Sequence, residues 1–215
     1  TIMRILLINT SDRTGGAAVA ANRLLKALQK TGVSANMLVR DKITQDTSVV
    51  SINTSAAKKL INRIRFVWER LVIFLCNHLS KENLFQVSIA NTGTDIRHYA
   101  LVREADVIHI HWINQGMLSL SDIKRLIDSG KPVVWTLHDM WPATGVCHYA
   151  ALCDQYRSEC TQCPMMKHLF FWNLARTVYR HKSTIGLEKI TFVGCSSWIT
   201  EMCKQSRLLR NASFY

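Results

Sequence analysis

The residues with the strongest chemical character stand together within residues 132–163. The apolar run PVVWTLH at 132–138 predicts a buried strand, and the pair His138-Asp139 follows at its carboxyl end. Ligands of an open α/β sheet sit in the crevice beyond the carboxyl ends of its strands. A histidine beside a carboxylate at that place can hydrogen-bond a substrate, so His138 and Asp139 are the candidate catalytic residues.

A cysteine-rich loop at residues 147–163 is the second chemical feature. It carries Cys147, Cys153, Cys160 and Cys163. The closing Cys-x-x-Cys is typical of zinc sites, in which four thiolates surround the ion. The loop has little apolar content, so a metal would supply order that packing cannot. We interpret the four as ligands of a structural zinc without a catalytic role; free thiols, disulfides and His148 as a substitute ligand stay open.

Two further strand ends carry candidate binding residues. The segment DVIHIH at 106–111 predicts a strand with His109 and His111 on one face. Trp112 and Asn114 follow it, so His111, Trp112 and Asn114 are candidate substrate-binding residues. A single histidine in a strand is more often structural, and Trp135 in the middle of its strand is expected in the core.

A glycine pair marks the start of the chain. Residues 3–8 predict a strand, Gly15-Gly16 a turn, and residues 17–29 a helix. Backbone N–H groups at a helix N-terminus can hold a phosphate. The spacing matches neither G-x-G-x-x-G nor the P-loop. Gly15 and Gly16 are therefore candidate contacts to a phosphate or sugar, with an ordinary tight turn as the alternative.

The remaining pattern alternates strands and helices. Further strands are expected at residues 36–39, 49–52 and 190–195, with another beginning near residue 211, and a strand or an extended edge is expected at residues 85–90. A polar turn and a short helix are expected at residues 91–98. Further helices are expected at residues 56–80, 119–128, 166–179 and 198–206, with Ser119 or Ser121 as one N-cap. This alternation predicts the class α/β, a Rossmann-like, doubly wound parallel sheet, as one domain over residues 1–215 with the cysteine loop inserted.

The long helix at 56–80 has two different faces. Its apolar stripe, expected to face the core, comprises Leu60, Ile64, Val67, Trp68, Leu71 and Leu75. Its opposite face comprises Lys59, Arg63, Phe66, Arg70 and Ile73. A cationic face that also exposes Phe and Ile suits the surface of an anionic membrane. A solvated face is the alternative.

Composition limits the classes of function. The chain has 215 residues, 48% of them hydrophobic, and a formal net charge of +12, which favours anionic partners. Nucleic acid is not expected, because the basic residues are spread over helices without a recognised binding motif. The longest apolar run, residues 71–76, is too short to span a bilayer. Seven cysteines without a signal-peptide pattern indicate a reducing cytosol, with Cys76, Cys195 and Cys203 as buried small side chains.

Taken together, the chain resembles the N-terminal, acceptor-side half of a GT-B glycosyltransferase, nearest to the retaining family 4 enzymes of bacterial polysaccharide and lipopolysaccharide assembly. The resemblance rests on MRILLINTSDRTGGAAVAANRLLKAL, DVIHIHWIN, KPVVWTLHDMWPATGVCHY, CDQYRSECTQCP and FVGCSSWI. It implies a second, donor-binding domain that this chain lacks. The family's Glu-x7-Glu motif belongs to that domain, and no two glutamates here stand eight positions apart.

The resemblance also implies roles. Gly15-Gly16 would approach the donor phosphate and His138 the transferred sugar, with Asp139 orienting His138 or meeting an acceptor hydroxyl. His111 and Trp112 would line the acceptor side. The implied donor is a UDP- or GDP-sugar, and the implied acceptor is a polysaccharide or lipid-linked glycan. The implied location is cytoplasmic, with peripheral contact at the inner face of the cell membrane. The alternative function is a stand-alone α/β binding module for a phosphorylated or sugar ligand, without catalysis.

Overall fold

The sheet is the centre of the molecule. The computed structural model describes residues 2–167 and 172–215. Within them, seven parallel strands lie in the order β3-β2-β1-β4-β5-β6-β7. The strands are β1 (Arg4–Ser11), β2 (Ser34–Asp41), β3 (Val49–Ser51), β4 (Val107–Ile110), β5 (Val133–Leu137), β6 (Thr191–Gly194) and β7 (Ser213–Phe214). The order reverses between β1 and β4, as in doubly wound folds. The predicted α/β, Rossmann-like class is confirmed.

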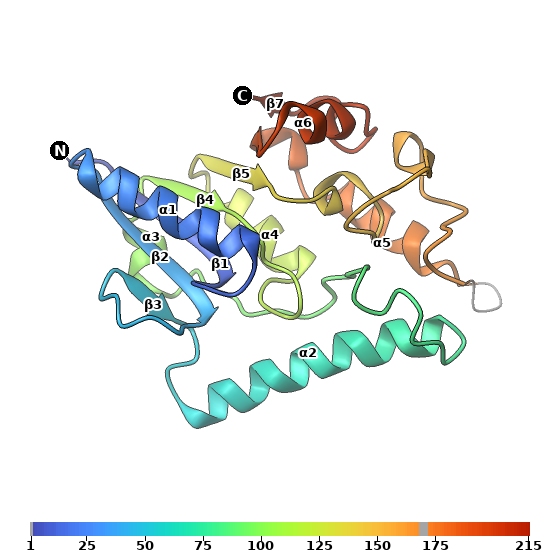
Figure 1. Cartoon of the computed structure of the whole chain (residues 1–215), viewed down its shortest axis with the longest axis horizontal. Helices are drawn as coiled ribbons and strands as arrows, with labels where there is room; N and C mark the ends of the chain where they lie inside the picture. The colour runs from blue at the N-terminus through green and yellow to red at the C-terminus, as the bar shows by residue number, and fades with distance from the viewer. Residues whose placement is uncertain (1, 168–171) are drawn as a thin grey trace.

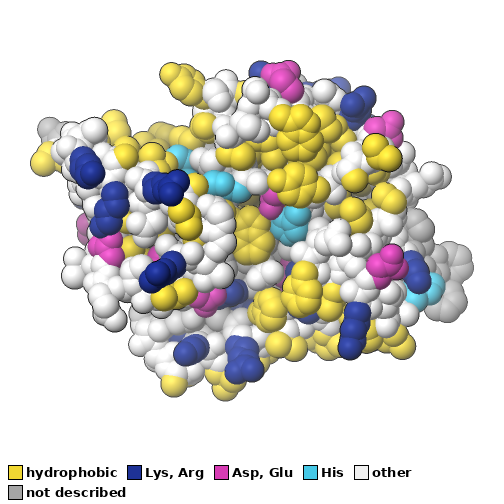
Figure 2. Space-filling model, viewed as in Figure 1, with side chains coloured by type: hydrophobic (Ala, Val, Ile, Leu, Met, Phe, Trp, Pro, Cys, Tyr) yellow, Lys and Arg dark blue, Asp and Glu magenta, His cyan; other side chains and the backbone are white. Residues whose placement is uncertain are grey.

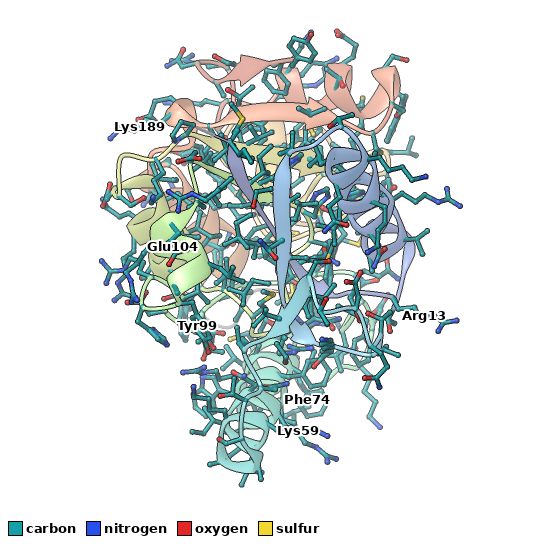
Figure 3. The ribbon with its side chains drawn as sticks, turned by 90° about the vertical axis from the view of Figure 1, so that its left-hand side faces the viewer. Arg13, Lys59, Phe74, Tyr99, Glu104 and Lys189 are labelled. Carbon is teal, nitrogen blue, oxygen red and sulfur yellow. The ribbon has the colours of Figure 1, made fainter. Side chains whose placement is uncertain are left out.

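Helices cover both faces of this sheet. Figures 1 and 3 show α1 on one face, with α3 and α4 on the other. The helices are α1 (Gly16–Lys30), α2 (Ala56–Cys76), α3 (Ala100–Glu104), α4 (Leu120–Ile127), α5 (Leu174–Lys182) and α6 (Ser197–Lys204), and the 3-10 turns are η1 (Trp141–Ala143), η2 (Gln155–Arg157) and η3 (Leu187–Lys189). Along β1, Leu7 packs with the core under α1, whereas Leu6 and Ile8 belong to the larger core on the other face. A parallel strand buried on both sides needs such a continuous apolar run.

Local sequence signals set several helix ends. Ser119 caps α4 in a capping box, because its hydroxyl accepts from the Asp122 amide while the Asp122 carboxylate accepts from the Ser119 amide. Ser196 caps α6 in a similar way by accepting from the Ile199 amide. Gly32 follows α1 with a φ of +83°, a left-handed conformation that favours glycine. Of the two predicted caps for α4, Ser119 is the one used.

Three predicted elements differ from the structure. Residues 85–90 form no strand; residues 85 and 86 belong to a turn, and Val87 makes one antiparallel bridge to Cys147. Residues 91–98 form no helix, and α3 begins only at Ala100. The helix predicted at 166–179 is α5, which begins at Leu174, and its predicted part at 168–171 lies outside the described residues. The predicted boundaries followed from the local pattern of polar residues. In the structure, residues 85–90 contact a distant loop instead, for example where the Ser88 amide donates to the Val146 carbonyl at 2.8 Å.

The faces of α2 are the reverse of those predicted. The six apolar residues expected in the core, Leu60, Ile64, Val67, Trp68, Leu71 and Leu75, are all exposed, whereas Arg70 and Ile73 are buried. The polar side turns inward because Glu69 accepts hydrogen bonds from the amides of Ile89 (2.8 Å) and Ala90 (2.9 Å). Arg70 in turn donates to the carbonyl of Val87 at 2.9 Å. The prediction that Arg70 and Ile73 belong to an outward, cationic face of this helix is therefore wrong.

Other core predictions have mixed outcomes. Trp135 is buried, and its indole N–H donates to the His111 carbonyl at 2.9 Å. Cys76 and Cys203 are buried as expected, but Cys195 is exposed, because it lies in the turn between β6 and α6, past the end of the strand. Within the described residues, no helix combines the length and the apolar character that crossing a membrane requires.

Candidate functional site

A pocket of about 540 Å³ opens beyond the carboxyl ends of β1, β2, β4 and β5. It is lined by Asn9, Thr10, Ser11, Thr14, Gly15, Gly16, Ala17, Arg40, Asp41, Phe85, Trp112, Gln115, His138, Asp139, His148 and Tyr149. The pocket straddles the boundary between β1 and β4, where the strand order reverses. Figure 2 shows histidine and apolar side chains gathered around a hollow on this face. This is where the topology of a doubly wound sheet places a ligand.

The N-terminus of α1 forms one wall of the pocket. Gly15 has a φ of +90° and carries no side-chain cap, and the first turn of α1 contains no acidic residue. An added Cβ at Gly16 would meet no atom within 4 Å. Uncapped amides at the start of a helix carry partial positive charge. This wall can therefore accept an anionic group without a competing side chain.

Three histidines stack behind the opposite wall. The ring of His109 lies 4.5 Å from that of His111, which lies 5.2 Å from that of His138. Nδ1 of His111 is 2.9 Å from Nε2 of His138, and Nε2 of His109 is 2.8 Å from the Thr136 hydroxyl. Burial lowers the pKa of His109 to about 4 and that of His111 to about 2. Burial also lowers the pKa of His138, although Asp139 opposes this. All three rings are therefore neutral near pH 7.

The neutral rings also have assignable tautomers. Nε2 of His111 is buried and has no hydrogen-bond partner in the part of the chain that the structure describes. A proton on that nitrogen would be a buried N–H donor without an acceptor, which is unfavourable. We therefore assign the proton of His111 to Nδ1. His111 then donates to Nε2 of His138, which leaves Nδ1 of His138 as an N–H donor. His138, which lines the pocket, offers a hydrogen bond without a positive charge.

Asp139 is the centre of a second network. One of its oxygens accepts from the Trp112 indole at 2.9 Å and from Nδ1 of His148 at 2.6 Å, and the other accepts from the Trp141 amide at 2.9 Å. Burial opposes ionisation, but these hydrogen bonds, that of His148 foremost, hold the pKa of Asp139 below its usual value. Among the described residues, the hydrogen bonds of the Asp139 carboxylate go to Trp112, Trp141 and His148, and its influence on the His138 ring is electrostatic. Asp139 thus fixes Trp112 and His148 rather than His138.

The same network contains a Ser-His-Asp arrangement. The Ser88 hydroxyl lies 3.0 Å from Nε2 of His148, whose Nδ1 meets Asp139. In hydrolases such a triad activates the serine as a nucleophile. Ser88, however, is 1% exposed and does not line the pocket. A substrate cannot reach its oxygen, so the triad positions the loop instead of cleaving a bond.

A buried lysine supports the turn that carries Asp139. Nζ of Lys182 donates to the carbonyls of Trp141 at 2.5 Å and Thr144 at 3.0 Å, and lies 3.5 Å from the centre of the Trp141 ring. Its side chain is fully buried, and this burial lowers its pKa to about 7. The lysine ties α5 to η1 and so fixes the loop between β5 and the cysteines.

The structure brings most of the predicted site residues together. Gly15, Gly16, Trp112, His138 and Asp139 all line the pocket. His111 and Asn114 are buried behind it, beside a narrow crevice. Within the described residues the side-chain oxygen of Asn114 has no hydrogen-bond partner, while its backbone carbonyl accepts from Thr10. His111 and Asn114 thus contact His138 and Thr10, which line the pocket.

Several lining residues were not predicted from the sequence. Arg40 and Asp41 end β2, so the rule that ligands lie at strand ends could have found them. Phe85 and Tyr149 are exposed at the rim, and Tyr149 stacks on Trp198 with 6.2 Å between ring centres. The contact between His148 and Asp139 could not be predicted from the sequence, because it depends on the path of the loop between them. His148 is a member of the Asp139 network, although the sequence offered it as a metal ligand.

The four loop cysteines share one small cavity. Cys147, Cys153, Cys160 and Cys163 line it together, and the Gly145 amide donates to the sulfur of Cys160 at 3.2 Å. In residues 2–167 and 172–215, however, no group of three or more His, Cys, Asp or Glu is arranged so that it could hold a metal ion. Zinc at this loop stays a prediction.

Comparison with known proteins gives one partial match. No protein-family model matches the chain. Over 68 residues it is 32% identical to a protein of Escherichia coli (strain K12) named "Putative colanic acid biosynthesis glycosyl transferase WcaC". The match covers 29% of this chain and 17% of that protein. Together with the parallel sheet, this similarity supports a glycosyltransferase-like domain.

Proposed function

We propose that this chain is the acceptor-side domain of a retaining glycosyltransferase of the GT-B type, acting on a UDP- or GDP-sugar and a polysaccharide or lipid-linked glycan. The observation that carries the proposal is the pocket at the switch point. There an uncapped helix N-terminus faces His138 and the Trp112–Asp139–His148 network. A phosphate-binding wall opposite hydrogen-bonding and aromatic groups suits a nucleotide-sugar better than a purely apolar ligand. Most contacts to the nucleotide would come from a second domain, and the cytoplasm is the proposed location.

In this proposal each wall has a separate task. The amides of Gly15, Gly16 and Ala17 hold the donor phosphate and stabilise its charge as the nucleotide leaves. Neutral His138 donates from Nδ1 to a hydroxyl of the transferred sugar. Its hydrogen bond from His111 keeps that tautomer in place. His138 is thus a positioning donor, since same-face substitution lets the departing phosphate assist the attacking hydroxyl.

The acceptor is proposed to lie against the aromatic rim. The Trp112 indole is held by Asp139 at its N–H, and its backbone amide donates to the Asn9 side chain at 2.8 Å. Exposed Phe85 and Tyr149 flank the same opening. Flat aromatic faces of this kind can stack on sugar rings. Asp139 is occupied by three donors, so its proposed role is to orient Trp112 and His148.

Calorimetric titration with UDP- and GDP-sugars tests the phosphate wall. Gly16→Asp places a negative charge at the start of α1, where an added side chain meets no atom within 4 Å. An acidic residue there suits the helix dipole, so the fold should hold while phosphate binding falls about tenfold or more. Gly16→Asn is the matched control, with the same size and no charge. Equal affinity of the Asp and Asn variants would remove this wall from the site.

The alternative is a binding module for a phosphorylated or sugar ligand without catalysis. It shares the pocket and the phosphate wall with the first proposal. The partial similarity to a glycosyl transferase favours transfer. Detection of sugar transfer to a glycan acceptor separates the two: binding without transfer, in a protein that also contains a donor domain, would favour the module.

We also propose that the cysteine loop holds a structural zinc. All four thiols line one cavity, and the Gly145 amide already donates to the sulfur of Cys160. Four zinc-bound thiolates leave a net negative charge, which would favour the charged form of buried Lys182, since Cys147 and Cys160 act on its pKa in the same direction. A buried cation needs such a counter-charge. The ion would order the loop that follows Asp139 and take no part in transfer.

A further inference from the structure

A second hollow lies at the edge of the sheet opposite the main pocket. Its volume is about 240 Å³, and it shares no lining residue with that pocket. β6 and β7 pair from Thr191 and Ser213, at their amino ends. η3 and the turn at residues 207–211 come just before those ends, and both line the hollow together with the end of α5. We name it the arginine hollow, after a lining that includes Arg180, Ser183, Glu188, Arg207, Arg210 and Asn211.

Buried contacts fix the backbone that carries two of these arginines. The Ser206 hydroxyl is buried and donates to the Ala143 carbonyl at 2.6 Å, and Leu209 is fully buried. The Leu209 amide donates to the Ser206 carbonyl at 3.1 Å, which closes the turn. Arg207 and Arg210 each follow one of these anchored residues. The turn therefore holds both guanidinium groups at the hollow.

The carboxylate of Glu159, which also lines the hollow, is already occupied. It lies 3.1 Å from the guanidinium of Arg176 and 3.7 Å from that of Arg180. The hydrogen bond from Arg176 is the main reason that the pKa of Glu159 is held below its ordinary value. Among the described residues, neither Arg207 nor Arg210 forms an ion pair with a carboxylate. Two guanidinium groups at the hollow are thus free to bind an anion.

The balance of charge indicates which anion fits. With Glu188 included, four guanidinium groups stand against two carboxylates at the hollow and its border, an excess of two positive charges. A phosphate monoester carries a charge of about −1.5 to −2 at pH 7, which matches this excess. Each guanidinium presents a planar fork of N–H donors to phosphate oxygens. A single carboxylate would engage one fork and leave the other unpaired.

We propose that the arginine hollow is a binding site for the phosphate group of a small phosphorylated metabolite. Arg207 and Arg210 donate to the phosphate oxygens. Glu188 accepts hydrogen bonds from hydroxyl groups of the ligand, and Ser183 and Asn211 offer further polar contacts. The hollow is smaller than the roughly 300–1,000 Å³ of sites for drug-sized ligands, so it suits a sugar phosphate better than a nucleotide. The site is independent of the proposed function of the main pocket.

Calorimetric titration with inorganic phosphate and with glucose 6-phosphate tests the site. The titrations use the Gly16→Asp protein, so that the phosphate wall of the main pocket does not contribute. Both probes should bind at one site, glucose 6-phosphate more tightly, and glucose should not bind. Arg207→Gln/Arg210→Gln in the same background should weaken both affinities by about tenfold or more, because the charge-assisted hydrogen bonds are lost.

Arg23→Gln/Lys30→Gln is the matched control, because it removes two positive charges from exposed residues of α1. Its affinity for both probes should equal that of the Gly16→Asp protein. Melting temperatures should also agree, since the replaced side chains of Arg207 and Arg210 are exposed. No binding of either phosphate probe at millimolar concentration would overturn the proposal. Equal affinities of the Arg207→Gln/Arg210→Gln variant and its control, or binding of glucose as tight as that of glucose 6-phosphate, would overturn it as well.

Discussion

The stacked histidines His109, His111 and His138 should make the stability of this protein depend on pH. His109 and His111 are neutral in the folded protein, with pKa values of about 4 and about 2, against 6.5 for the free side chain. Below pH 6.5 the unfolded chain therefore binds protons that the folded chain does not. Stability is fully present above that pH and is lost as the pH falls towards the folded values.

The magnitude follows from the same values. Between about pH 8 and about pH 5, proton linkage for His109 removes about 2 kcal/mol from the free energy of unfolding. His111 removes about 2 kcal/mol more over the same interval, since both rings stay neutral in the folded state at pH 5. The total of about 4 kcal/mol is a large share of the roughly 5–15 kcal/mol typical of a domain. His138, whose pKa is also lowered by burial, adds to the loss.

Urea denaturation at the two pH values measures this loss. His109→Gln removes one titrating ring while an amide can keep the hydrogen bond to Thr136, so its loss should be about 2 kcal/mol smaller than that of the parent. The control His98→Gln replaces an exposed histidine outside the three stacked rings, and its loss should match that of the parent. A parent loss under about 1 kcal/mol, or no difference between His109→Gln and His98→Gln, would refute the reasoning.

Three other outcomes are expected. Glu69→Ala should lower the free energy of unfolding by about 3–5 kcal/mol in urea titrations, because it leaves buried Arg70 without its carboxylate partner. A loss below about 1 kcal/mol would contradict the idea that the contacts of Glu69 attach α2 to the fold. His138→Ala in the active enzyme should lower turnover by about tenfold or more at nearly unchanged nucleotide affinity, measured by steady-state kinetics and calorimetry; unchanged turnover would exclude it from the site. Elemental analysis of the reduced protein should find about one zinc per chain, and less in Cys160→Ser. A chelator should lower the melting temperature, because the ion orders the loop. A protein that is isolated without metal, and whose melting temperature the chelator does not change, would exclude zinc.

The sheet and the position of the pocket could be predicted from the sequence because both follow from short-range patterns. Strands buried on both faces are continuous apolar runs, and β1 and β5 show them plainly. Since the strands are parallel, their carboxyl ends meet at one edge, so Gly15, Trp112 and His138, which each follow a predicted strand, are expected at that edge. The same rule, applied to β2, would have added Arg40 and Asp41.

The contacts within the site could not be predicted in this way. The pairing of His148 with Asp139 depends on the path of the loop after η1, which Lys182 fixes from a distant helix. The orientation of α2 failed for a related reason. Hydrophobic periodicity locates an apolar face but does not say whether it meets the core or a partner, and buried contacts of Glu69 and Arg70 decided that outcome.

The two faces of α2 differ in their contacts, and this difference affects which of its residues can change during evolution. Glu69 and its hydrogen-bond partners, together with buried Ile73 and Cys76, attach α2 to the fold, whereas the apolar side chains on its outer face are 41–59% exposed. Substitutions on the outer face should therefore cost less stability than substitutions at Glu69 or Ile73. The surface that this helix presents can thus change while its buried contacts and the pocket at the strand ends stay as they are.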